Sequence, residues 1–126
     1  MKNLTIWIKI SGISILILGI IHLATAFTVL PMWSNIGTGW LSVFSFFYLT
    51  AGLGTILPGL ISTISTEKLN DSHRRAWTII LICSIYSILL GVDPVISMKG
   101  NPFAYVMLVI ALSLFIPTIM IKKKMS

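Results

Sequence analysis

The long apolar stretches of the chain hold several side chains that can exchange protons or form hydrogen bonds, among them His22, Tyr48, Asp93 and Tyr105. An imidazole exchanges protons near neutral pH and a carboxylate can hold its tautomer, so His22 and Asp93 would form a proton-handling or ligand-orienting pair. Ionisable side chains are costly inside a bilayer and mark functional sites by default. We therefore predict that these four residues form one ligand-binding pocket in the outer half of a membrane domain, provided that their helix faces converge.

Both ionisable residues also have a structural interpretation. Asp93-Pro94 matches a helix start, in which Asp accepts backbone N–H bonds and Pro takes the first helical position. Asp93 would then cap a short segment after a break at Gly91. A lone histidine in a helix bundle can simply bond to a neighbouring Ser, Thr or carbonyl group. The sequence leaves these alternatives open.

The apolar stretches hold no recognisable motif for metal, haem or phosphate chemistry. His22 has no second histidine in an apolar run, and Cys83 is the single cysteine of the chain. No glycine-rich phosphate loop or nucleophile elbow occurs. We expect no catalytic residue, no metal and no resident cofactor. The sequence leaves open whether a quinone binds as a ligand.

The composition indicates a membrane protein. Of the 126 residues, 56% are apolar and 10% are charged, and the mean hydropathy is +1.00. Soluble domains have about 45–50% apolar and about 25% charged residues, so this chain has too little charge to coat a water-soluble fold. We predict a single all-α transmembrane domain, an integral membrane four-helix bundle. Its expected partner is the lipid bilayer that surrounds it.

Four apolar segments are long enough to cross a bilayer as helices. Residues 10 to 66 include no Asp, Glu, Lys or Arg, and the turn-forming segment 31–39 divides this stretch into two spans. The polar loop 66–75 precedes the third span, and Asn101-Pro102, typical of a helix start, precedes the fourth. The predicted helices cover about residues 5–30, 40–65, 76–98 and 101–121.

The basic residues predict the orientation of these helices. The net charge is +6. The basic residues of the chain lie near the predicted helix ends. This placement indicates that they orient the helices in the membrane rather than bind nucleic acid. Of the nine Lys and Arg residues, all except Lys99 lie on the side of the termini and the 66–75 loop. The positive-inside rule then places both termini in the cytoplasm, an N-in/C-in arrangement in a bacterial plasma membrane.

The first helix also resembles a secretory signal peptide. Two lysines precede a long apolar run that includes Ala24-Thr25-Ala26, a small-residue sequence typical of a cleavage site. The apolar residues continue to Leu30 and the run is long enough to span, which favours an uncleaved helix. Cleavage after Ala26 would leave three helices and an outer N-terminus.

Small residues form stripes that predict how the helices pack. In the second helix, small and polar residues recur at alternating spacings of three and four, and in the first helix two glycines share one face. Burial alone cannot hold helices together in lipid, so close backbone approach and interhelical hydrogen bonds must do so. We therefore expect a packing role, rather than a substrate groove, for Gly12, Gly19, Gly52, Thr55, Gly59 and Ser62.

The chain resembles a family of small bacterial membrane proteins. Gly-Ile-Ile-His at 19–22, the small-residue second helix and Gly-Val-Asp-Pro at 91–94 resemble the DoxX-like four-helix proteins and their uncharacterised relatives, from about Ile10 to Ile121. The resemblance implies a plasma-membrane four-helix bundle. A few relatives are membrane subunits of sulfur-compound:quinone oxidoreductases, which implies that a quinone-facing role is conceivable. No redox motif is present, so no catalytic residue is carried over.

These observations favour a non-catalytic membrane component that binds a membrane-protein partner or a lipophilic ligand. Two alternatives are a quinone-linked redox subunit that uses His22, Tyr48 and Asp93, and a small homodimeric transporter. A toxin-immunity or stress protein also stays open. The first helix has no acid at its middle to couple protons, which argues against the transporter.

Overall fold

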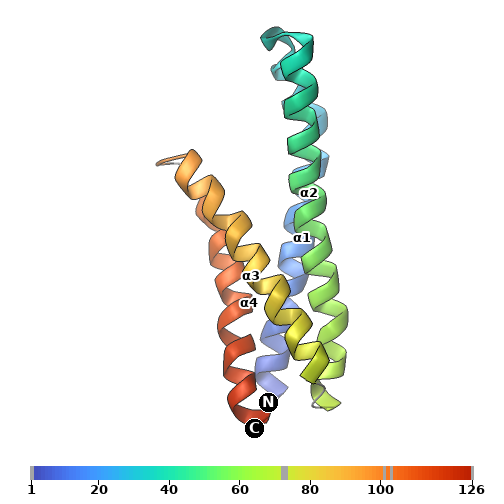
Figure 1. The fold of residues 1–126 in the computed structure, drawn as a ribbon, viewed down its shortest axis with the longest axis vertical. Helices are drawn as coiled ribbons and strands as arrows, with labels where there is room; N and C mark the ends of the chain where they lie inside the picture. The colour runs from blue at the N-terminus through green and yellow to red at the C-terminus, as the bar shows by residue number, and fades with distance from the viewer. Residues whose placement is uncertain (1, 72–73, 101, 103, 126) are drawn as a thin grey trace.

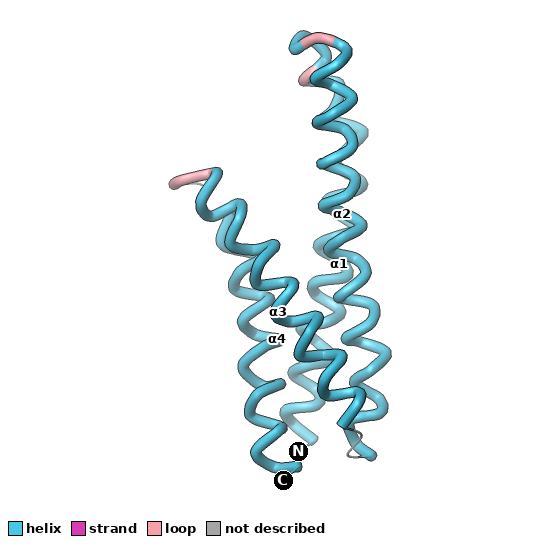
Figure 2. Tube along the Cα trace, in the orientation of Figure 1, coloured by secondary structure: helices cyan, strands magenta, loops and turns pink. Residues whose placement is uncertain are grey.

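The described part of the chain is almost entirely helical (Figures 1 and 2). The computed structural model describes residues 2–71, 74–100, 102 and 104–125. Within these residues the regular elements are all helical, which confirms the all-α class. They are α1 (Lys2–Met32), the short 3₁₀-helix η1 (Ser34–Ile36), α2 (Thr38–Glu67), the 3₁₀-helix η2 (Lys68–Asp71), α3 (Arg74–Ser97) and α4 (Ala104–Met125).

The four α-helices are long and apolar enough to cross a membrane. They contain 31, 30, 24 and 22 residues. At 1.5 Å per residue these lengths correspond to about 46, 45, 36 and 33 Å, against a hydrocarbon core of about 30 Å. The hairpin of α1 and α2 is therefore longer than a bilayer core requires, whereas α3 and α4 match it closely.

Two of the differences between the observed and the expected helix ends lie in the segments that connect the helices. Of the predicted loop 66–75, residues 66 and 67 belong to α2 and residues 68–71 form η2, while residues 72 and 73 lie outside the described part. The start expected at Asn101 also lies outside it. The carbonyl of Pro102 accepts a hydrogen bond from the N–H of Tyr105 at 3.2 Å, within a turn that leads into α4.

Asp93 does not begin a helix. The helix α3 continues through Gly91 and Pro94 to Ser97, and the N–H of Met98 donates to the Pro94 carbonyl at 2.8 Å. The interpretation of Asp93 as the cap of a separate segment is therefore wrong. Proline is tolerated inside such a helix because neighbouring groups in a bundle satisfy the backbone that it frees.

The four helices form a ring of two hairpins (Figure 1). In the described residues α1 contacts α2 and α4, and α3 contacts the same two helices, while the diagonal pairs make no contact. The hairpins lie together at the end that holds both chain termini. They separate toward the other end, where the tip of α1 and α2 projects well beyond that of α3 and α4.

The closed end is held by apolar and polar contacts. The Ser11 and Ser113 hydroxyls lie 2.9 Å apart between α1 and α4, and the Trp77 indole N–H donates to the Thr118 carbonyl at 2.8 Å. The ammonium of Lys122 lies 4.8 Å from the centre of the Trp77 ring, a cation–π contact. The buried apolar core comprises Ile8, Ile15, Leu69, Ala76, Ile80, Met107, Leu114 and Ile121.

Two glycine pairs let the backbones of α1 and α2 approach closely. Gly12 lies opposite Gly59, and Gly19 lies opposite Gly52. A Cβ atom on Gly59 would overlap the backbone nitrogen of Leu16 and lie 2.9 Å from the Gly12 carbonyl oxygen. All four glycines thus lie in the contact between the helices, where small residues permit the packing that a membrane bundle needs.

The other two members of the small-residue stripe lie elsewhere on α2. Ser62 is fully buried and faces the thiol of Cys83 on α3, although the two make no hydrogen bond of good geometry. Thr55 lines a cavity between the hairpins. The stripe is therefore shared among α1, α3 and the cavity, because α2 packs between α1 and α3.

Candidate functional site

A cavity of about 550 Å³ lies where the two hairpins separate. This volume falls within the range of about 300–1,000 Å³ that is typical of small-molecule sites. Its walls are mainly apolar and come from all four α-helices: Leu18, Ile21 and Ala51 on one hairpin, and Leu89, Leu90, Pro94, Met98, Ala104, Val106 and Met107 on the other. Its polar lining consists of His22, Thr25, Thr55 and Asp93.

The imidazole of His22 is held against α2. Its Nε2 donates to the Tyr48 carbonyl at 3.2 Å, and the two rings stack with centroids 4.1 Å apart and planes 20° from parallel. Because a carbonyl oxygen accepts hydrogen bonds and does not donate them, Nε2 must carry the proton. In the neutral ring Nδ1 is then an acceptor, and it has no partner among the described residues.

Thr25 and Tyr48 complete this network. The Thr25 hydroxyl donates to the His22 carbonyl at 2.7 Å, and its oxygen lies 2.7 Å from the Tyr48 hydroxyl. Since threonine has one hydroxyl hydrogen, Tyr48 must donate to Thr25. Tyr48 does not line the cavity. Its carbonyl and its ring both contact the imidazole of His22, so it positions that side chain.

Asp93 lines the cavity from the opposite hairpin. Its carboxylate makes no hydrogen bond or ion pair with the described residues, and none joins it to His22. The two ionisable residues thus share one cavity without direct contact. This arrangement leaves space between them for a ligand.

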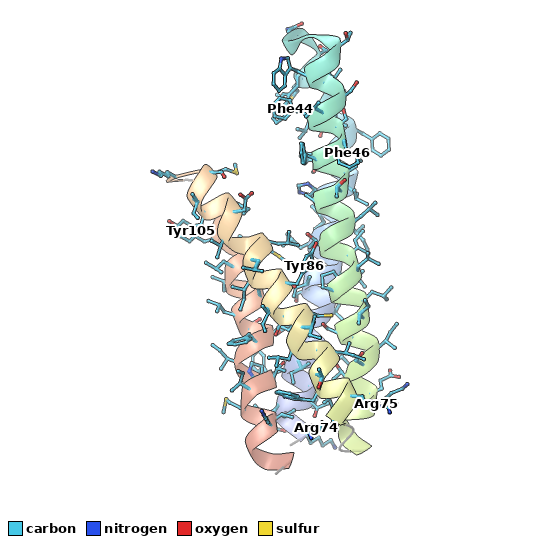
Figure 3. All side chains as sticks on the ribbon, viewed as in Figure 1. Phe44, Phe46, Arg74, Arg75, Tyr86 and Tyr105 are labelled. Atoms are coloured by element: carbon cyan, nitrogen blue, oxygen red, sulfur yellow. The ribbon has the colours of Figure 1, made fainter. Side chains whose placement is uncertain are left out.

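Tyr105 is not part of this arrangement. Of the four residues expected to converge, His22 and Asp93 line the cavity, while Tyr48 and Tyr105 do not. Its side chain is 48% exposed and points away from α1 and α2 (Figure 3). The helix α4 begins at Ala104, so Ala104 and Met107 share the buried face while Tyr105 turns outward. The expected position assumed that this helix began at residue 101.

Two contacts between the helices were not expected from the sequence. The Thr25 hydroxyl on α1 bonds to the Tyr48 hydroxyl on α2, and the position of Thr25 three residues from His22, on the same helix face, is the signal that could have indicated this. Tyr86 reaches from α3 toward α2 (Figure 3), where its hydroxyl would lie 2.9 Å from a Cβ on Gly54. Tyr86 on α3 therefore contacts α2 of the other hairpin.

Replacing Thr25 by valine is expected to lower the free energy of unfolding by about 1 kcal/mol. The change leaves the Tyr48 hydroxyl without an acceptor, and hydrogen bonds between membrane helices contribute about 0.6 kcal/mol on average and up to about 1.7 kcal/mol. Adding Tyr48→Phe should cost less than the sum of the single changes, because it removes the unpaired hydroxyl. The measurement is unfolding in mixed micelles, followed by circular dichroism.

Thr28→Val is the matched control for this cycle. The Thr28 hydroxyl donates to the Thr25 carbonyl at 2.9 Å within α1, without a partner on α2. This variant should therefore keep the stability of the parent chain. Equal losses for Thr25→Val and Thr28→Val, or strict additivity in the double variant, would count against the network.

Comparison with known proteins gave no match to a family model, to a curated protein or to a solved structure. The class of protein is therefore indicated by the fold alone. Four apolar helices of spanning length, arranged as two hairpins around a cavity, indicate a multi-pass membrane protein.

Proposed function

We propose that this protein is a non-catalytic component of a bacterial plasma membrane and that it binds a lipophilic ligand between its two hairpins. The observation that carries this proposal is the cavity of about 550 Å³, which has apolar walls and four polar lining residues. Ligand sites typically combine such walls with a small number of placed polar groups.

The distribution of charge supports an orientation with both termini in the cytoplasm. The end that holds the termini carries the exposed Lys2, Lys9, Arg74, Arg75 and Lys122, whereas Lys99 lies at the opposite end. This asymmetry fits the positive-inside rule. In this orientation the hairpins separate toward the outer face, and the cavity with His22 and Asp93 lies in the outer half.

The resemblance to DoxX-like proteins fits the same proposal. Because a few relatives of that kind are subunits of quinone oxidoreductases, a quinone is one lipophile that such a cavity could hold. A small homodimeric transporter is a further alternative. A membrane-protein partner is the other candidate occupant of the gap between the hairpins. These alternatives differ in the mass of what the protein carries, so one experiment separates them.

The test is native mass spectrometry of the protein extracted in mild detergent, with the parent chain beside Ala51→Phe. Ala51 lines the cavity, and a phenyl group there should displace the ligand. Ala24→Phe is the matched control, because Ala24 is exposed on α1 and does not line the cavity. We expect a lipophile of defined mass on the parent chain and on Ala24→Phe, and none on Ala51→Phe.

Other masses would identify another function. A bound quinone would favour the redox subunit, a doubled polypeptide mass the homodimer, and a second polypeptide the partner protein. A polypeptide shortened by its first 26 residues would show cleavage after Ala26. Equal binding in all three proteins, or empty protein throughout, would overturn the cavity as the binding site.

A further inference from the structure

We infer that the cavity is built for a lipophilic ammonium ion, whose apolar chain lies between the hairpins while its N–H groups bond to Asp93 and His22. This inference rests on the proposed function, since it names the chemical class of the ligand. It follows from an inventory of the hydrogen-bond donors and acceptors that the cavity presents.

The polar donors in the lining are already used within the chain. The Thr55 hydroxyl donates to the Ala51 carbonyl at 2.8 Å, and the Thr25 hydroxyl donates to the His22 carbonyl. The Nε2–H of His22 is bonded to the Tyr48 carbonyl, and the Tyr48 hydroxyl donates to Thr25. A ligand that brought further acceptors, such as the two carbonyl groups of a quinone, would find no uncommitted side-chain donor among these residues.

The acceptors in the lining remain available. Asp93 contributes two carboxylate oxygens without a partner among the described residues, and His22 contributes Nδ1. The site therefore offers acceptors on both walls, which complement a head group that carries several N–H donors.

The charged residues around the cavity also favour a cation as the ligand. Of the three acidic residues in the sequence, Asp93 is the one in the cavity lining, and Glu67 pairs with Lys9 at the opposite end, 3.3 Å apart. The basic residue nearest in the chain, Lys99, is exposed beyond the end of α3 and does not line the cavity. Asp93 is exposed on a helix of spanning length. A carboxylate that such a helix carries into a membrane is costly without a counter-charge, and an ammonium ion in the cavity would supply one.

The experiment compares three probes that share a twelve-carbon chain and differ in the head group. Dodecylamine is a cation with three N–H donors at neutral pH, dodecanol is neutral and dodecanoate is an anion. Each is titrated against the purified full chain in one detergent, and the bound fraction is read by native mass spectrometry. We expect dodecylamine to bind most tightly and dodecanoate least.

Asp93→Asn tests the residue that carries the inference. The variant keeps the shape of the side chain and removes its charge, so dodecylamine affinity should fall about tenfold or more, while dodecanol binding changes little. Glu67→Gln is the matched control, because it removes an acid outside the cavity, and it should keep the preference of the parent chain. Circular dichroism of each variant checks that its helices remain folded.

The outcomes separate this inference from the proposed function. If Ala51→Phe abolishes binding of all three probes and the parent chain shows no preference among head groups, the cavity binds lipophiles and the ammonium assignment is wrong. If none of the probes binds the parent chain, the proposed cavity function fails as well. A preference for dodecylamine that survives in Asp93→Asn would also overturn the assignment.

Discussion

Gly59→Ala is expected to lower the free energy of unfolding by about 2–3 kcal/mol, or to prevent closure of the α1–α2 hairpin altogether. The added Cβ would overlap the backbone nitrogen of Leu16 and lie 2.8 Å from its Cα atom. Backbone atoms cannot move away by a rotamer change, so the two helices would have to separate. Overpacking in a well-packed core costs typically about 1–3 kcal/mol, and a clash with backbone belongs at the upper end.

The same helix provides a graded comparison. A Cβ on Gly52 would meet the side chain of Leu23, which can change rotamer, so Gly52→Ala should cost less than Gly59→Ala. A Cβ on Gly39 would have no atom within 4 Å beyond its chain neighbours and the backbone of its own helix. Gly39→Ala should therefore be neutral or slightly stabilising, because alanine favours helix over glycine by up to about 1 kcal/mol.

Unfolding of the three variants in mixed micelles gives the ranking directly. The expected order of stability is Gly39→Ala, then Gly52→Ala, then Gly59→Ala. If all three unfold at the same denaturant concentration, close backbone contact does not hold the hairpin together. The four-helix architecture would then depend on the other interhelical contacts, such as the hydroxyl pair of Ser11 and Ser113.

The sequence predicted those features that depend on one helix or on neighbouring helices. The long charge-free stretch indicated two spans, and the structure has two apolar helices there. The spacing of glycines indicated a close contact, and Gly12, Gly19, Gly52 and Gly59 lie in it. Both signals are local, because they depend on hydropathy and helical periodicity alone.

Features that depend on the relative placement of the two hairpins could not be predicted in this way. An apolar residue in a membrane helix looks the same in the sequence whether it faces lipid, the core or a cavity, as Leu89 and Met107 show. The direction of Tyr105 depends on the residue at which α4 begins, since each residue turns a helix by about 100°. Asp93-Pro94 resembled a helix start, but α3 continues past both residues to Ser97.

Labelling of single cysteines is expected to give an all-or-none result for the proposed orientation. In a Cys83→Ala chain, Ser34→Cys places a thiol at the tip of the α1–α2 hairpin, and Glu67→Cys places one at the opposite end. We expect a membrane-impermeant maleimide to modify Ser34→Cys in intact bacterial cells that express the chain. Glu67→Cys should react after the membrane is made permeable, because eight of the nine basic residues favour the cytoplasm at that end.

The two positions are matched for this comparison because both are exposed in the structure. Loss of Glu67 removes an exposed ion pair with Lys9, which is worth about 0–1 kcal/mol, and acidic residues contribute little to orientation. The Cys83→Ala chain alone gives the background, since its thiol is absent. Labelling of Glu67→Cys in intact cells, with Ser34→Cys protected, would show the opposite orientation and place the cavity of His22 and Asp93 in the cytoplasmic half.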